Sequence, residues 1–295
     1  MVPLSRLGRA LLRQRALLVL LVILGLYGGY VYWRSLQQYV GTDDAYVGAH
    51  VIPIAAQVSG PVAFVYVRNN SQVTAHSPLF EIDPHPYQLA VSAAVAAVGE
   101  RQAVWANAAA ISRRTRRMAA HRFLSPQASD TAQATVNADA ATLAAAKVAL
   151  AQAQLNLAHC LIRAPTDGYI SAFKLQPGAY IRSGDPLFAL IASHDYWVTA
   201  NFKETDVTHI RVGDRAHVHV DMYPDQLFQG RVVGISGGSG TAFSLLPAEN
   251  ATGNWVKVTQ RVPVRIQILN LNPSRPLRIG TSASATVFLR NPRKP

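Results

Sequence analysis

The sequence predicts a mostly β protein of the α+β class, in which a β sandwich is split in two by an antiparallel helical hairpin. One β-type motif occurs twice, at residues 58–62 and 166–170, and each copy has Pro-Leu-Phe at the same distance beyond its glycine. Between the copies lies a block with 25 alanines in residues 84–160. A β pattern then runs to residue 289 and predicts a small antiparallel barrel, while an apolar run before the first copy predicts a single transmembrane helix.

These observations divide the 295-residue chain into consecutive parts. We expect a cytoplasmic tail at 1–15, a transmembrane anchor at 16–33, a linker with a leading strand at 34–49, sandwich halves at 50–83 and 163–192, the hairpin at 84–162, the barrel at 193–289 and a tail at 290–295. The single cysteine, Cys160, excludes an internal disulfide framework, so packing must hold these parts.

The anchor is predicted by eighteen uncharged, mostly apolar residues at 16–33, which are enough to cross a hydrocarbon layer as one helix. Four arginines precede this run, and the positive-inside rule therefore places Met1 in the cytoplasm. A cleaved signal peptide would share the pattern. Where small residues should mark its cleavage site the chain has tyrosines and a tryptophan, between residues 27 and 33, so we favour a retained anchor.

The two copies of the β motif share one offset, so that Val62 corresponds to Ile170, Val73 to Ile181 and residues 78–80 to 186–188. Apolar residues alternate over short runs in each copy, which is typical of half-buried strands joined by tight turns. Each half is too small for a core of its own. We therefore expect the two halves to fold together into one flattened sandwich.

The alanine-rich block predicts two long helices that run out and back, because alanine favours helix and the larger residues recur at heptad spacing. The expected seam residues are Val91, Val95, Val98 and Trp105 in the first helix and Val136, Leu143, Leu150 and Leu157 in the second. Pro126 cannot continue a helix that runs up to it, which places the turn near residues 124–130. Each arm would be about 50 Å long at ~1.5 Å per residue.

The sequence has no constellation typical of catalysis, metal binding or nucleic-acid binding. His217 and His219 share one strand face, but no third ligand is near them in the sequence, and the glycine-rich residues 236–240 are not followed by a lysine or a helix. The net charge of +12 is densest at residues 113–117, without a zinc spacing or a stacking aromatic motif. We interpret that run as a solvated helix face, and expect neither an enzyme nor a nucleic-acid partner.

The split sandwich resembles a lipoyl or biotinyl domain, and its interruption by a helical hairpin resembles the HlyD/EmrA family of membrane fusion proteins, the periplasmic adaptors of bacterial export systems. Residues 201–205, 240–258 and 260–266 are similar to the barrel signature of EmrA-type adaptors, and residues 42–47 to the start of their periplasmic part. In a lipoyl carrier the modified lysine lies on the turn between the halves. Here the hairpin replaces that turn and its one lysine, Lys147, lies in mid-helix, so we expect no lipoylation, no biotinylation and no other cofactor.

Some family members have an Arg, a Leu and a Ser at set spacing beside the hairpin turn, where they dock the outer-membrane channel. The corresponding residue types here are Arg117, Arg122, Leu124, Ser125 and Ser129, although the family spacing fits them only with a gap. The hairpin is also shorter than in the best-known EmrA-type proteins. We expect these five residues to form the channel-docking tip, with Leu124 in contact because it has little core to join.

The resemblance implies a periplasmic adaptor of a tripartite efflux pump, anchored by a single pass in the bacterial inner membrane with its bulk in the periplasm. The expected partners are an inner-membrane drug exporter of the major-facilitator type, a TolC-like outer-membrane channel, and further copies of the chain in a trimeric or hexameric ring. Three alternatives stay open. They are another cargo, such as aromatic acids or a secreted polypeptide, a lipoyl or biotinyl carrier domain of an enzyme complex, and an envelope scaffold without transport.

Overall fold

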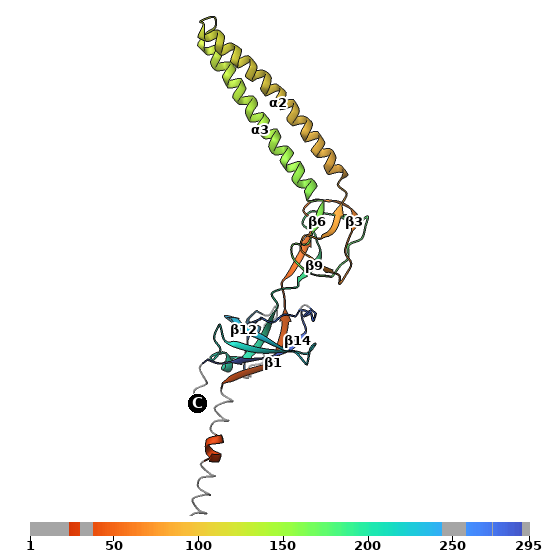
Figure 1. Ribbon diagram of the computed structural model, residues 1–295, viewed down its shortest axis with the longest axis vertical. Helices are drawn as coiled ribbons and strands as arrows, with labels where there is room; N and C mark the ends of the chain where they lie inside the picture. The colour runs from red at the N-terminus through yellow and green to blue at the C-terminus, as the bar shows by residue number, and fades with distance from the viewer. Residues whose placement is uncertain (1–23, 30–37, 244–257, 273, 291–295) are drawn as a thin grey trace, which may run out of the picture. The chain divides into compact units, whose positions relative to one another are not determined.

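The computed structural model describes residues 24–29, 38–243, 258–272 and 274–290, and the chain forms two compact units (Figure 1). Val51–Ala192 forms one unit, and the described residues before Val51 and after Ala192 belong to the other. Residues 24–29 are helical. The rest of the expected anchor, residues 16–33, lies outside the described residues, and no helix within them is long and apolar enough to cross a membrane.

The unit Val51–Ala192 contains two four-stranded sheets in which the halves of the split motif interleave. The first half supplies β2 (Val51–Ala55), β3 (Gly60–Val65), β4 (Gln72–Val73) and β5 (Pro78–Ile82), and the second supplies β6 (Leu161–Arg163), β7 (Gly168–Ser171), β8 (Tyr180–Ile181) and β9 (Pro186–Ala192). The strand orders are β2-β9-β7-β4 and β6-β5-β3-β8. Each sheet contains two strands from each half. If every strand is replaced by the corresponding strand of the other half, the strand order of one sheet becomes that of the other. The prediction that the halves fold together is confirmed.

Corresponding residues of the two halves build the core of this sandwich. Val62 and Ile170 are both buried, and so are Val73 and Ile181. The rings of Phe80 and Phe188, which the offset relates to each other, meet edge to face with their centroids 6.0 Å apart. Because each residue packs against its counterpart or its counterpart's neighbours, neither half could bury this core without the other.

The hairpin consists of α2 (His85–Ala120) and α3 (Pro126–Ala158), which run side by side in opposite directions (Figure 1). At ~1.5 Å per residue the two helices are about 54 and 50 Å long. The turn between them occupies residues 121–125, earlier than the expected 124–130. Pro126 begins α3 instead of ending the turn, because a proline is well suited to the first helical position, where its missing N–H has no partner in any case.

The second unit is a closed barrel with the strand order β1-β10-β13-β12-β11-β14. Its strands are β1 (Tyr39–Gly48), β10 (Trp197–Lys203), β11 (Arg215–Val220), β12 (Leu227–Ile235), β13 (Arg261–Ile268) and β14 (Ser282–Phe288), with the short helices α4 (Glu204–Val207) and η1 (Gly240–Phe243).

Strand β1 is a correction to the sequence analysis, which placed its residues in a linker with a leading strand and began the barrel at residue 193. Ala45 lies opposite Ala200 of β10 and opposite Ala283 of β14. Without β1 those two strands would both have unpaired edges. The barrel therefore needs a strand from the part of the chain that precedes the sandwich.

Candidate functional site

The hairpin is fixed to the sandwich at its base. The Tyr87 hydroxyl donates a hydrogen bond to the carbonyl oxygen of Ser59 at 2.7 Å, and both Tyr87 and Leu157 pack against the buried core. The backbone N–H of Ile82 donates to the carbonyl oxygen of Cys160 at 2.9 Å. These contacts attach the start of α2 and the end of α3 to the same sandwich, so the base of the hairpin is fixed relative to the sandwich.

Two titratable groups at this base are held in their neutral forms. Burial, together with the nearby carboxylates of Glu81 and Asp83, raises the pKa of the Cys160 thiol to about 11. Burial likewise raises the pKa of the Tyr87 hydroxyl. A thiol with such a pKa is a poor nucleophile at neutral pH, so Cys160 acts here as a small apolar residue.

The seam between the helices has one strongly buried leucine. Leu143 is buried. Six of the other residues expected at the seam are half-buried, namely Val91, Val98, Trp105, Val136, Leu150 and Leu157. The exception is Val95, which is 52% exposed, while Ala94 is half-buried in its place. Steps of three and four through Ala94 and steps of four and three through Val95 both lead from Val91 to Val98, and the burial selects Ala94, so the assignment of Val95 to the seam is wrong.

Towards the turn the seam is polar. Ser112 is buried, and its hydroxyl donates to Oε1 of Gln133 at 3.4 Å. The Arg116 guanidinium donates to the same oxygen. A buried polar layer of this kind fixes the register of two helices at some cost in stability. The sequence analysis missed Gln133, although its position three residues before Val136 continues the heptad pattern of α3.

The tip brings together most of the residues expected to dock a channel. Arg117 lies exposed in the last turn of α2, Arg122 lies exposed in the turn, and Leu124 beside it is 37% exposed. The Ser125 hydroxyl caps α3 by accepting a hydrogen bond from the N–H of Ala128 at 3.3 Å. Ser129 is half-buried in the first turn of α3.

Phe123 is the most exposed large apolar residue at the tip and was missed by the sequence analysis. Its side chain is 75% exposed, although its ring lies 6.3 Å from that of His121. The signal was present, because an aromatic residue in a turn between two thin helices has no core to enter. Phe123 and Leu124, beside the exposed Arg122, form an apolar and basic end that fits a binding role rather than catalysis.

The remaining candidate sites are surface residues. Lys147 lies exposed in the middle of α3. His217 and His219 lie on the outer face of β11, and the His217 ring packs edge to face against Phe288 at 4.7 Å. Within the described ranges no group of three or more His, Cys, Asp or Glu side chains is placed to hold a metal ion.

A split sandwich that carries a helical hairpin and is followed by a small closed barrel defines the class of membrane fusion proteins. Residues 50–193 match the family described as "RND MFP, barrel-sandwich hybrid domain", and residues 195–289 match the "AAEA-like beta-barrel domain". The chain also has the fold of the membrane fusion protein Spr0693 from Streptococcus pneumoniae R6, with a TM-score of 0.62 at 14% identity, covering 86% of this chain and 99% of that one.

Curated relatives are similar along most of the chain. It is 33% identical over 321 residues to the multidrug export protein EmrA of Haemophilus influenzae, covering 92% of this chain and 82% of the relative. It is 34% identical over 310 residues to the EmrA protein of Escherichia coli K12, covering 88% and 80%. The chain belongs to the EmrA family of membrane fusion proteins.

Proposed function

We propose that this protein is the periplasmic adaptor of a tripartite efflux pump and links an inner-membrane exporter to an outer-membrane channel. The observation that carries the proposal is the hairpin: two helices of about 50 Å are fixed at one end to a rigid sandwich and present Phe123 and Leu124 to solvent at the other. Such an element is suited to spanning a distance and docking at its end. The relatives named as multidrug export proteins support toxic compounds as the cargo.

The proposed arrangement places residues 16–33 in the inner membrane and the bulk of the chain in the periplasm. There the barrel and the sandwich lie beside an exporter of the major-facilitator type, and the tip meets a TolC-like channel. The sequence has no phosphate-binding loop pattern, so the exporter supplies the energy in this scheme.

Self-assembly into a ring is supported by a second apolar stripe on α2. Val104, Ile111 and Met118 are spaced by seven residues and are exposed to solvent. Heptad spacing places them along one face of the helix, where Val104 and Ile111 border a groove between α2 and α3 and stay partly open to solvent. In the proposed ring this stripe packs against the hairpin of a neighbouring copy, which supplies the additional burial that a narrow hairpin needs.

The docking role is tested by Leu124→Asp and Phe123→Asp in a strain that depends on this protein for drug resistance. A charge at the apolar tip should lower resistance towards that of the deletion strain and abolish crosslinking between the tip and the channel. Leu89→Asp is the matched control, because the exposure of Leu89 on α2, 60%, lies between those of Leu124 and Phe123, and Leu89 lies at the base of the hairpin. Resistance and crosslinking that survive both tip substitutions would contradict the proposal.

A further inference from the structure

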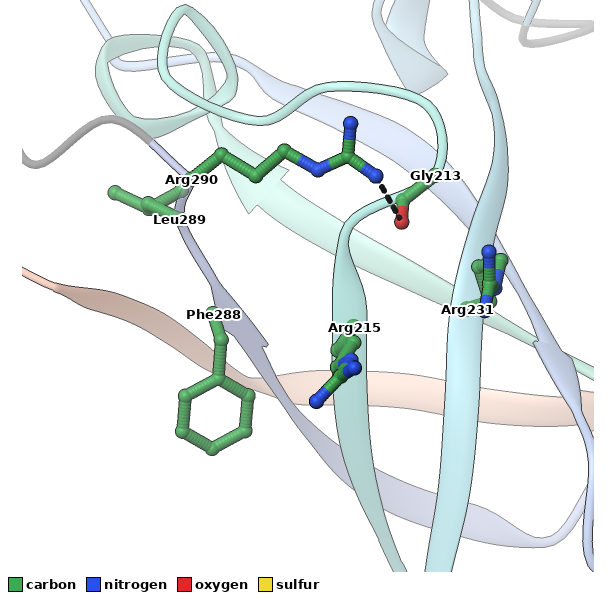
Figure 2. A pocket seen from close by; sticks show the side chains of 6 residues that line it. All are labelled: Gly213, Arg215, Arg231, Phe288, Leu289 and Arg290. Atoms are coloured by element: carbon green, nitrogen blue, oxygen red, sulfur yellow. Dashed lines mark hydrogen bonds between the residues drawn. The ribbon is translucent and has the colours of Figure 1, made fainter.

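One end of the barrel carries a basic cavity that the adaptor role does not use. It has a volume of about 380 Å³ and is lined by Gly213, Arg215, Arg231, Phe288, Leu289 and Arg290 (Figure 2). Arg215 of β11 lies directly opposite Arg231 of β12, and Phe288 of β14 lies opposite Arg215 on its other side. All three strands alternate between buried and exposed residues, and these side chains belong to the outer face.

The two arginines face each other without a counter-charge. Like charges directly opposite on neighbouring strands destabilise a sheet. Neither guanidinium has an ion pair or a hydrogen bond with any residue in the described part of the chain. The nearby carboxylate of Asp214 is fully buried, accepts the backbone N–H of Arg211 at 2.8 Å and lies 3.6 Å from the Arg290 guanidinium. Arg215 and Arg231 thus leave two positive charges for an external anion.

The cavity lies where the chain reaches the barrel from the expected anchor. The N–H of Leu289 donates to the carbonyl oxygen of Gln38 at 2.8 Å, and Tyr39 is the register partner of Phe288. Gln38 is five residues beyond Trp33, and five extended residues span at most about 18 Å. If residues 16–33 cross the inner membrane, as the proposed function requires, the cavity is within that distance of the lipid headgroups.

Two exposed aromatic side chains accompany the arginines. Tyr39 is 41% exposed and Phe288 is 38% exposed, and both lie on the outer face of the barrel. Aromatic rings beside basic residues are typical of surfaces that lie at a membrane interface. A soluble anion would need the guanidinium groups but not this exposed aromatic pair.

We propose that Arg215 and Arg231 bind the phosphate group of an anionic phospholipid in the periplasmic leaflet of the inner membrane. Guanidinium groups pair with phosphate oxygens through two parallel hydrogen bonds, a geometry that a lysine cannot match. Tyr39 and Phe288 lie against the glycerol region of the same leaflet. This inference rests on the proposed function and adds to it a lipid contact that seats the barrel on the membrane beside the exporter.

The test is a lipid titration of the purified full chain in a non-ionic detergent, followed by native mass spectrometry. Phosphatidylglycerol and phosphatidylcholine with the same acyl chains are compared, and inorganic phosphate is added as a competitor in a further arm. Phosphatidylglycerol should bind more tightly than phosphatidylcholine. Arg215→Gln/Arg231→Gln should weaken phosphatidylglycerol binding about thirtyfold, at about 1 kcal/mol for each basic residue, and should weaken binding of the zwitterionic phosphatidylcholine by less.

Arg113→Gln/Arg114→Gln on the exposed face of α2 removes the same charge and is expected to bind phosphatidylglycerol normally. Circular dichroism checks that both variants keep their β structure. Equal loss in the two double variants, equal affinity for the two lipids, or full displacement by millimolar inorganic phosphate would each overturn the proposal. The titration needs no partner protein, so a failed docking test at Leu124 with intact lipid preference would refute the adaptor role alone.

Discussion

Gly168 is the position in the sandwich where a single added carbon should cost most. It begins β7, and a Cβ there would overlap the carbonyl oxygen of Ile191 on β9 and lie 3.0 Å from Cδ1 of the fully buried Leu190. A backbone oxygen cannot rotate away, so Gly168→Ala must move β7 and β9 apart. We expect the loss of about two ladder hydrogen bonds at ~1 kcal/mol each and over-packing of about 1–3 kcal/mol, which together come to about 3–5 kcal/mol.

The symmetry of the sandwich provides a matched comparison at Gly60, which the offset relates to Gly168. A Cβ at Gly60 would meet only the Cγ2 methyl group of Ile82, at 2.7 Å. Ile82 is β-branched and fully buried, so its methyl group moves only with local repacking, but no backbone atom is in the way; Gly60→Ala should therefore cost about 1–3 kcal/mol. Gly99→Ala on α2 meets open space and should stabilise the helix by up to about 1 kcal/mol.

Hydrogen exchange on the full chain, followed by mass spectrometry, measures the free energy of opening for peptides in β7 and β9. It distinguishes them from peptides of the barrel. The expected order of destabilisation is Gly168→Ala, then Gly60→Ala, with Gly99→Ala neutral or stabilising. Equal losses at the two related glycines, or unchanged protection in Gly168→Ala, would refute the argument that a backbone contact makes Gly168 special.

Three further predictions concern the hairpin and its base. Leu143→Asp removes the buried seam leucine and should lower the free energy of unfolding by at least about 2–5 kcal/mol, which is measured as a lower melting temperature of the helical signal. Ala144→Asp, on the exposed side of α3, is the control and should cost little. An unchanged melting curve for Leu143→Asp would count against the seam. Tyr87→Phe should cost about 1 kcal/mol by removing the hydrogen bond to Ser59, measured as faster exchange at the start of α2, with a smaller effect for the exposed hydroxyl in Tyr66→Phe. Raising the pKa of Cys160 from 9.0 to about 11 leaves about a hundredfold less thiolate at pH 8, so iodoacetamide should label the folded chain at least that much more slowly than the unfolded chain. As the pH rises, the thiol ionises in the unfolded chain before it does so in the folded chain. The stability that the raised pKa contributes is therefore complete below pH 9 and is lost as the pH rises through 11. Iodoacetamide labelling of the folded chain at an ordinary rate would show that the thiol is accessible.

The parts of the fold that the sequence predicts well are those with a local or repeated signal. The offset that relates Val62 to Ile170 is visible without any structure, and it predicted that the two halves fold together; the interleaving of their strands is seen only in the structure. Helix propensity and heptad spacing predicted the two arms, but not their details. Ala94 and Val95 both lie at heptad steps between Val91 and Val98, so spacing alone could not choose between them, and Val95 was chosen by its size. Pro126 is equally compatible with a turn and with a first helical position, so the sequence pattern left the turn uncertain by a few residues.

The features that were missed depend on contacts between residues far apart in the chain. Strand β1 has an ordinary alternating pattern, and nothing within it indicates that its partners are β10 and β14. Arg215 and Arg231 are sixteen residues apart and become neighbours only through the register of β11 and β12. Phe123 was overlooked for a different reason, because the sequence analysis sought the residue types of a known docking pattern and passed over the aromatic residue beside them.

The position of β1 also sets an order in which the molecule can be completed. As the chain is synthesised, β1 emerges early, yet both of its neighbours begin only at Trp197 and Ser282. Until then its free N–H and C=O groups are a possible template for pairing with another chain. The sandwich, by contrast, has all of its strands once Ala192 has emerged. The sandwich can therefore fold before the barrel, and a chain that stops short of Ser282 has an open barrel in which one edge of β1 is unpaired.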